Sequence, residues 1–200
     1  SVYNKPMSQL KVNSIIPVAG VATGQGGGVI QTIRTIKTDV FTSTAVTIAN
    51  GGTDGLGAYN QATAVTNFTV SITPINANNI LMLDISIGNA GTASASTIYG
   101  FVTKGGNAAT NFLGDKTGTN SNRASFARTY IDNSYAGQMS FRGSEVAGTT
   151  SQITYGLKVV ASANLVLGST GAHLTGNNAA DGLAFIATAP LIYTVTEVSA

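Results

Sequence analysis

The sequence lacks cysteine and has a single histidine, His173, among its 200 residues. The absence of cysteine excludes disulfide bonds and cysteine-based zinc sites, and it leaves the redox compartment open. One histidine with scattered carboxylates cannot supply the three protein ligands of a catalytic zinc ion. A Ser or Thr nucleophile would have only this imidazole as its base, and no G-x-S-x-G motif is present. We therefore expect no metal, no cofactor and no catalytic residues, and we predict that the chain is not an enzyme.

Charge is also scarce, because Asp, Glu, Lys and Arg make up 9% of the residues, against roughly 25% in an ordinary globular protein. The polar surface must instead consist of Thr, Ser, Asn, Gln and Gly, which suit strands and turns. Such a surface gives little ionic repulsion between copies, so we infer a protein that sits in an assembly. The acids sit singly and mostly in turns, as do Asp54, Asp115, Asp132, Glu145 and Asp181. An acid pair for sugar hydrolysis is therefore the least favoured hypothesis.

Long basic and long apolar runs are missing too. The ten basic residues are scattered from Lys5 to Lys158, so we expect no nucleic-acid partner. No apolar run approaches the roughly 18 to 20 residues that span a bilayer, so we expect no membrane insertion. Residues 15–22 resemble the end of a signal peptide but are too short for one. The start at Ser1 is expected to reflect the loss of an initiator Met.

The clearest pattern present is the alternation over residues 149–161. Because successive side chains of a strand point to opposite faces, this segment has one buried face and one mostly solvated face. The solvated positions are Thr154, Gly156 and Lys158. The apolar positions are Ile153, Tyr155, Leu157, Val159 and Ala161. We predict a strand here, with Leu157 in the core.

Further strands are expected along the rest of the chain. Residues 29–40 have apolar side chains at helical spacing, but their Ile, Thr and Val content favours a strand, with a break near residues 38–42. Residues 164–167 are expected to form an edge strand. Loops are expected at residues 50–57, 105–122 and 168–182. The expected strands are 29–48 with this break, 65–73, 80–87, 97–104, 123–131, 138–142, 149–161, 164–167, 183–187 and 191–198.

About ten short strands, with no helix longer than two turns, predict an all-β fold. The spacing is typical of an antiparallel sandwich or barrel. Residues 80–87 are apolar on one face, and Ile80 and Met82 make the other face partly apolar. We therefore expect this strand to be covered on both sides. Asp84 on its second face is expected to be exposed or hydrogen-bonded rather than catalytic.

Residues 1–28 differ in composition from the rest and end in four glycines, at positions 24, 26, 27 and 28. A phosphate-binding loop would need a following Lys and Ser or Thr, which are absent, so we interpret the glycines as a flexible linker. A single arm cannot bury its own apolar side chains, so it must lie on the main domain, on a copy of itself or on a partner. We therefore predict an attachment arm at residues 1–28 and a β head domain at residues 29–200. The apolar arm residues are Leu10, Val12, Ile15 and Ile16.

Tyrosines and arginines gather in the second half of the chain. Both residue types are favoured at binding hot spots, and both are equally ordinary on strands with solvated ends. Our candidate recognition residues are Arg128, Tyr130 and Tyr135.

Several blocks of the sequence resemble virion proteins of bacteriophages, especially the structural or tail-fibre-like proteins of cyanophages and other marine phages. The blocks are MSQLKVNSIIPVAGVATGQGGG at 7–28, IKTDVFTST at 36–44, FTVSITPINANNILML at 68–83, NRASFA at 122–127, GTTSQITYGLKV at 148–159 and IYTVTEVSA at 192–200. Residues 160–190 depart from the pattern. These motifs are structural rather than catalytic.

The resemblance implies a jelly-roll-like β-sandwich that forms a homotrimer on a virus particle. Other virion proteins, and a glycan or protein of the host surface, would be its partners. One hypothesis is a host-recognition module of a tail fibre, which would use loops 50–63, 105–122 and 168–182. The alternative is a capsid decoration protein whose arm anchors it to the shell. We expect residues 7–23 to dock onto the particle or to thread along the trimer axis, and residues 29–200 to form a projecting head.

Overall fold

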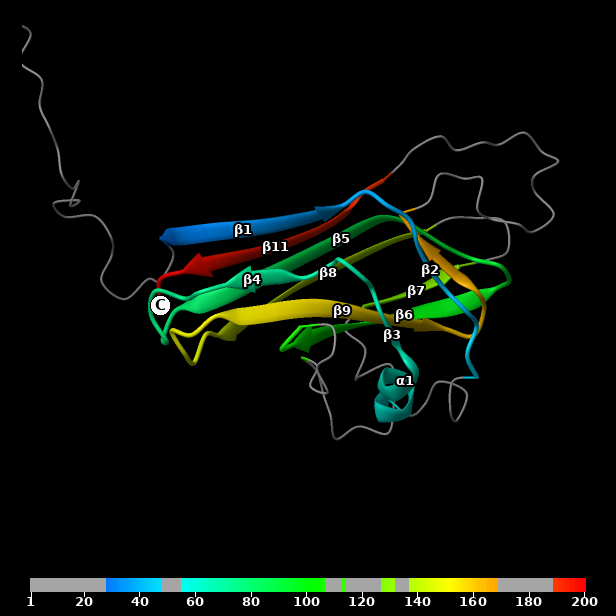
Figure 1. The fold of residues 1–200 in the computed structure, drawn as a ribbon, viewed down its shortest axis with the longest axis horizontal. Coiled ribbons are helices and arrows are strands. Elements are labelled where there is room, and N and C mark those ends of the chain that lie inside the picture. Colours follow the sequence, from blue (N-terminus) through cyan, green and yellow to red (C-terminus); the bar gives the residue numbers. More distant parts are fainter. Residues whose placement is uncertain (1–27, 48–54, 107–112, 114–126, 132–136, 169–188) are drawn as a thin grey trace, which may run out of the picture.

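The computed structural model describes residues 28–47, 55–106, 113, 127–131, 137–168 and 189–200. This part of the chain is nearly all strand, with one short helix (Figure 1). In chain order the elements are β1 (Val29–Lys37), β2 (Phe41–Ser43), α1 (Gly55–Gln61), β3 (Thr63–Ala64), β4 (Val70–Ile72), β5 (Ile80–Thr92), β6 (Ser96–Lys104), β7 (Ala127–Ile131), β8 (Gly137–Val146), β9 (Ile153–Ala161), β10 (Leu165–Leu167) and β11 (Leu191–Val198).

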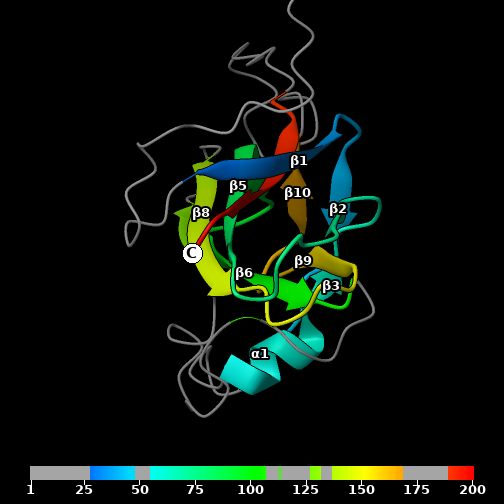
Figure 2. The same ribbon diagram turned by 90° about the vertical axis from the view of Figure 1, so that its left-hand side faces the viewer.

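The strands form two antiparallel sheets that pack face to face (Figures 1 and 2). The first sheet contains β1-β11-β5-β8, and the second contains β4-β9-β6-β7. Numbered along the chain, these eight strands have the orders 1-8-3-6 and 2-7-4-5, which is the arrangement of a jelly roll. The predicted all-β antiparallel sandwich is therefore confirmed.

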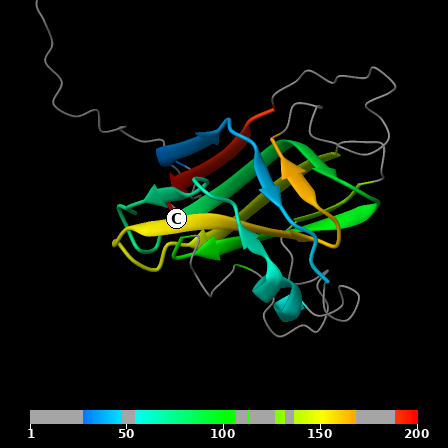
Figure 3. The ribbon, with the colours of Figure 1, turned by 45° about the vertical axis from the view of Figure 1, so that its right-hand side comes forward.

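Three short strands extend this framework. β10 pairs with β5 beyond the end of β11, and β2 pairs with the other side of β10, as Figure 3 shows. The prediction that residues 164–167 form an edge strand is wrong, because β10 lies between two neighbours. β2, rather than β10, is therefore the edge strand at this end of the first sheet. In the second sheet, β3 pairs with β9 next to β4.

β9 supplies the centre of the core, as its alternation predicts. Its side chains at 153, 155, 157, 159 and 161 are all buried and belong to one apolar cluster. The same cluster holds Leu81, Leu83, Ile85 and Ile87 from β5 of the opposite sheet. Burial of each Leu or Ile side chain contributes roughly 1.5 to 3 kcal/mol relative to exposure. The interior between the sheets is therefore the main source of stability.

The outer faces of the two sheets differ, and here a prediction is wrong. β5 was expected to be covered on both sides, but Met82 on its outer face is 51% exposed. β6, by contrast, has two buried faces. Its Ile98 and Val102 join the main core, while Tyr99 and Phe101 join a second cluster on the other side of the sheet.

Helix α1 makes that second cluster. Residues 50–57 were predicted to be a loop, but a helix begins at Gly55 and its Ala58 and Tyr59 are buried. The Tyr59 ring meets Phe101 edge to face at 5.5 Å, and Lys158 Nζ lies 4.7 Å from the Tyr59 centroid. Two glycines in seven residues make a poor isolated helix, so this packing stabilises it. The face of β9 that was expected to be solvated is therefore partly covered.

Several strand boundaries also differ from the prediction. Residues 29–37 form a strand rather than a helix, and a break follows at 38–40 as expected, but β2 ends at Ser43 instead of continuing to 48. The strand expected at 65–73 starts only at Val70, because Asn67 adopts a left-handed φ of 56° that turns the chain. β5 runs on to Thr92 and β8 to Val146. The strand expected at 183–187 lies outside the described residues.

β1 and β11 are joined where the first begins and the second ends. The backbone N–H of Ser199 donates to the carbonyl of Gly28 at 3.0 Å, and the N–H of Gly28 donates to Ser199 Oγ at 3.2 Å. The ladder then runs from Val29 opposite Val198 to Lys37 opposite Leu191. Gly28, where the described part of the chain begins, therefore lies beside Ser199.

Candidate functional site

Four of the eight acidic residues lie in the described part of the chain, and each has a partner. Asp84 of β5 accepts a hydrogen bond from Arg142 Nε of β8 at 2.9 Å, and the side chains of Arg142 and Asp84 are 84% and 44% exposed. Such surface pairs contribute at most about 1 kcal/mol. The prediction that Asp84 is exposed or hydrogen-bonded is confirmed.

Asp39 pairs with the buried Lys37 at the end of β1. The hydrogen bond from Lys37 is the main reason why the pKa of Asp39 lies below its ordinary value. Burial of the lysine stem with its charge satisfied by a carboxylate is a common arrangement for an amphipathic side chain. This pair holds residues 38–40, between β1 and β2, against the end of β1.

Glu145 of β8 connects the two sheets. Tyr155 of β9 donates its hydroxyl hydrogen to Glu145 Oε1, and Lys104 Nζ of β6 lies 3.0 Å from the same oxygen. Burial, and then the bond to Glu145, raise the pKa of Tyr155, so this phenol stays neutral at all physiological pH values. Nearby, the Tyr193 hydroxyl is buried with no hydrogen-bond partner among the described residues. The contacts of Glu145 with Tyr155 and Lys104 thus stabilise the packing of β8 against the second sheet.

Glu197 near the end of β11 is fully buried and accepts four hydrogen bonds. Gln31 Nε2 of β1 donates to Oε2 at 2.6 Å. Asn79 Nδ2 and the backbone N–H groups of Ile75 and Asn76 donate to Oε1 at 2.6, 2.9 and 3.4 Å. Burial by itself raises the pKa of this carboxyl, but the hydrogen bonds outweigh burial and hold the pKa below its ordinary value. The carboxylate thus fastens the turn before β5 to β1 and β11.

Sequence reasoning missed Glu197, although a signal was present. Residues 191, 193 and 195 form the inward face of the expected last strand, and residue 197 continues the same series. A carboxylate at a buried position must be paired or hydrogen-bonded. The alternation alone therefore pointed to a buried, satisfied glutamate.

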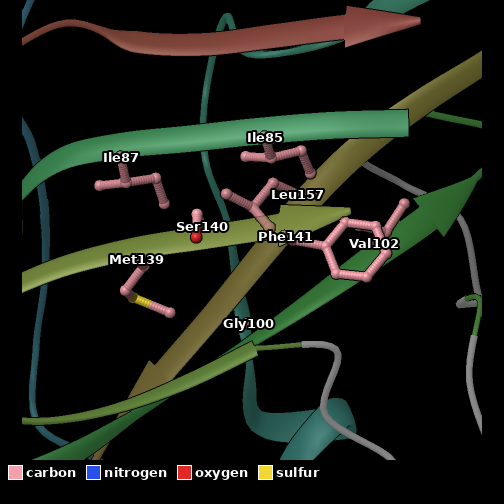
Figure 4. A pocket seen from close by; sticks show the side chains of 8 residues that line it. All are labelled: Ile85, Ile87, Gly100, Val102, Met139, Ser140, Phe141 and Leu157. Atoms are coloured by element: carbon pink, nitrogen blue, oxygen red, sulfur yellow. The ribbon is translucent and has the colours of Figure 1, made fainter. Parts of the chain in front are cut away.

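The opening between the sheets is too small for an organic ligand. Figure 4 shows side chains of β5, β8 and β9 directed into it, and its volume is about 10 Å³. Ligand pockets typically have volumes of about 300 to 1,000 Å³. The lining residues are Ile85, Ile87, Gly100, Val102, Met139, Ser140, Phe141 and Leu157. Among the described residues there is also no group of three His, Asp or Glu that could hold a metal ion.

The candidate recognition residues are only partly placed. Tyr130 lies on β7, at the edge of the second sheet, and is 67% exposed. Arg128 is two residues earlier on the same strand, opposite Tyr99 in the ladder. Tyr135 lies outside the described residues, as does His173.

The predicted arm and most of the predicted recognition loops also fall outside the described residues. The arm residues Leu10, Val12, Ile15 and Ile16 belong to the undescribed range 1–27. Loop 50–63 is described only from residue 55, where α1 begins. No helix in the part of the chain that the structure covers is long and apolar enough to cross a membrane.

No family model and no curated protein matches the sequence. The fold is similar to a solved structure of infectious bursal disease virus, Gx strain, with a TM-score of 0.34 and 14% identity, over 92% of this chain and 45% of that chain. It is also similar to the VP2 subviral particle of that virus, with a TM-score of 0.36 and 12% identity, over 98% of this chain and 48% of that chain. This chain spans just under half the length of both. At these scores the likeness carries no conclusion about function.

Proposed function

We propose that this chain is a non-enzymatic structural component of a bacteriophage particle, and more specifically the projecting head of a tail-fibre or spike protein. The observation that carries the proposal is the set of hydrogen bonds that the Glu197 carboxylate accepts. Glu197 lies in the block at 192–200 that resembles phage virion proteins, and its partners Ile75, Asn76 and Asn79 lie in the block at 68–83. Two resembling blocks more than a hundred residues apart are thus parts of one structural unit.

The other blocks support the same proposal, because they coincide with the framework of the sandwich. The block at 148–159 holds most of β9, and the block at 192–200 holds most of β11. β9 and β11 are interior strands of the two sheets. A resemblance concentrated in framework strands indicates a shared architecture rather than a shared reaction.

The polar groups are consistent with a role that needs no chemistry. The described acids are engaged by Arg142, Lys37, Tyr155 with Lys104, and the four donors around Glu197. A low-charge surface of Thr, Ser and Asn suits a protein held in an assembly. Residues 7–23 would attach the head to other virion proteins, and the homotrimer implied by the resemblance stays a prediction.

The test is the copy number and position of the chain in purified particles, measured by quantitative mass spectrometry and by imaging of labelled virions. A few copies at the tail are the expected result. Hundreds of copies over the shell would replace the tail role by capsid decoration, with the arm as the anchor. Absence from particles would overturn the virion proposal.

Host recognition is tested separately with the isolated chain. Excess wild-type protein should compete with the phage for adsorption to its host, and Tyr130→Ala should compete less well. Val146→Ala is the matched control, because Val146 is similarly exposed at 59% but lies on β8 of the other sheet. Equal competition by both variants would remove Tyr130 from the recognition surface.

A further inference from the structure

β1 is an edge strand that carries apolar side chains without a cover. It ends the first sheet beside β11, and no other described strand pairs with its outer side (Figure 1). Val29, Ile30, Ile33 and Ile36 are 66%, 41%, 36% and 53% exposed. An edge presents unpaired backbone N–H and C=O groups that can pair with another strand. Long apolar edges are usually blunted by Pro, by Lys, by β-bulges or by shortening. β1 has nine residues and no Pro, and its register shift against β11 is confined to its start, between Val29 and Gln31.

The other edges are less suited to pairing. β2, β3, β4 and β7 have three, two, three and five residues. The edge of β4 is moreover covered by β1, because Thr35 Oγ1 donates to the carbonyl of Thr69 and Gln31 Nε2 donates to that of Thr73, both at 2.8 Å. β8 is long, but its most exposed positions are mainly polar. These are Gln138, Ser140, Arg142, Ser144 and Val146.

The sequence of β1 is complementary to itself. In an antiparallel pair centred on Ile33, Ile30 stands opposite Ile36, Gln31 opposite Thr35, and Thr32 opposite Arg34. Each isoleucine then faces an isoleucine, Val29 stands opposite Lys37, and no two like charges are opposed. A pair centred on Arg34 would oppose two guanidinium groups, and one centred on Thr32 would oppose Arg34 to Ile30. Charge and apolar pattern thus select one register.

We propose that β1 pairs with β1 of a second copy of this chain, antiparallel, about a two-fold axis at Ile33. The contact is isologous, so both copies use the same surface. It joins the two first sheets into one continuous sheet and covers the exposed isoleucines of both edges. The scarcity of charge, 9% of residues, leaves little repulsion between the copies.

The geometry also says which copies can be joined. Antiparallel pairing sends the two Gly28 ends in opposite directions, about 33 Å apart for ten residues of strand. Two chains that share one attachment point would leave it in the same direction. The β1 contact therefore links heads with different attachment points, and a trimer would have to use another surface.

A cross-linking experiment tests the register. Because the chain has no cysteine, Ile33→Cys introduces a single thiol that the axis places opposite its own copy. Opposed Cα atoms are about 4.5 to 5.5 Å apart, which allows a disulfide. Thr32→Cys is the control, because the Cα atoms of residue 32 in the two copies would lie about 8 Å apart, too far for a disulfide. We expect oxidised dimer from Ile33→Cys and from the double variant Thr32→Cys/Arg34→Cys, and little from Thr32→Cys alone.

A charge experiment tests the contact in solution. The full chain should have the mass of two chains by light scattering at high micromolar concentration. Thr32→Glu, which faces Arg34 of the second copy, should lower the dissociation constant several-fold, and Thr32→Lys should raise it by about the same factor. Met82→Lys, exposed on the same sheet but away from β1, should change neither. Circular dichroism shows that each variant is folded.

Three results would overturn the proposal. One is a folded chain that stays a single-chain species at every concentration. Another is a dimer that ignores both Thr32 variants and fails to cross-link at position 33. The third is a three-chain species with the same failure to cross-link, which would assign association to a different surface.

Discussion

β5 and β6 are consecutive strands in the interiors of opposite sheets, and they differ in what lies on their outer faces. On β6 both faces are buried, because α1 places Ala58 and Tyr59 over Tyr99 and Phe101. On β5 the outer face is uncovered, and Met82, Asp84 and Ser86 point away from the core. Both outer faces carry apolar side chains, so the sequences of the two strands do not show which face is covered. The difference comes from α1, a seven-residue helix distant in the sequence from β6.

The largest expected effect is in the core that both strands share. Leu157→Ala removes a buried β9 side chain that faces β5 across the sandwich, and it should lower the free energy of unfolding by about 2 to 5 kcal/mol. Urea denaturation of folded protein measures the change. A loss below about 0.5 kcal/mol would mean that Leu157 is not in the core.

Removal of the cover of β6 should come next. Tyr59→Ala deletes the ring that packs on Phe101 and under Lys158, and it should cost about 2 to 4 kcal/mol in the same assay. Exposure of Phe101 should also increase binding of a hydrophobic dye. Unchanged stability would show that α1 does not support the outer face of β6.

Glu197 lies on the inward face of β11, and Glu197→Gln should cost about 1 to 3 kcal/mol at neutral pH, because an amide N–H₂ would meet donors. The folded-state pKa of Glu197 is lowered, so its contribution is present above the unfolded value near 4.5 and is lost as pH falls through the folded pKa. The difference between wild type and variant should therefore shrink below about pH 4. Urea unfolding across pH 3 to 7 measures it, and a constant difference would exclude a charged Glu197 as the cause.

The smallest effect should be on the bare face of β5. Met82→Thr places a β-branched polar residue at a position that is already half exposed, so stability should change by less than about 0.5 kcal/mol. Thermal or urea unfolding of this variant, beside Tyr59→Ala, compares the two outer faces directly. A loss of 2 kcal/mol or more would mean that something covers Met82 after all.

The inward faces of the strands could be predicted from the sequence, because alternation is a local property. Ile153 to Ala161 on β9 and Leu81 to Ile87 on β5 are buried as their spacing indicated. The outward faces could not, since cover depends on packing between distant elements. α1 has two glycines, at 55 and 57, and its composition favours a turn over a helix.

The candidate site was predictable to a smaller extent. Tyr130 is exposed on an edge strand, in keeping with a recognition role that stays a prediction. The free edge of β1 was not foreseen, because residues 29–37 predict a strand but not its place in a sheet. Edge and interior positions follow from pairing over the whole chain. The buried Glu197 was within reach of the alternation at 191–197.

The two hydrogen bonds between Gly28 and Ser199 have a mechanical consequence. If residues 28 and 199 are pulled apart, the load falls first on Val29 opposite Val198, so the two strands would separate one residue pair at a time rather than shear together. The hydrogen bond from Gln31 to Glu197 would be among the first side-chain contacts to break. Release of β1 would lengthen a tether by about 30 Å while β11, β5 and β8 stay paired. Force applied between residues 28 and 199 would thus release β1 before it reaches the core.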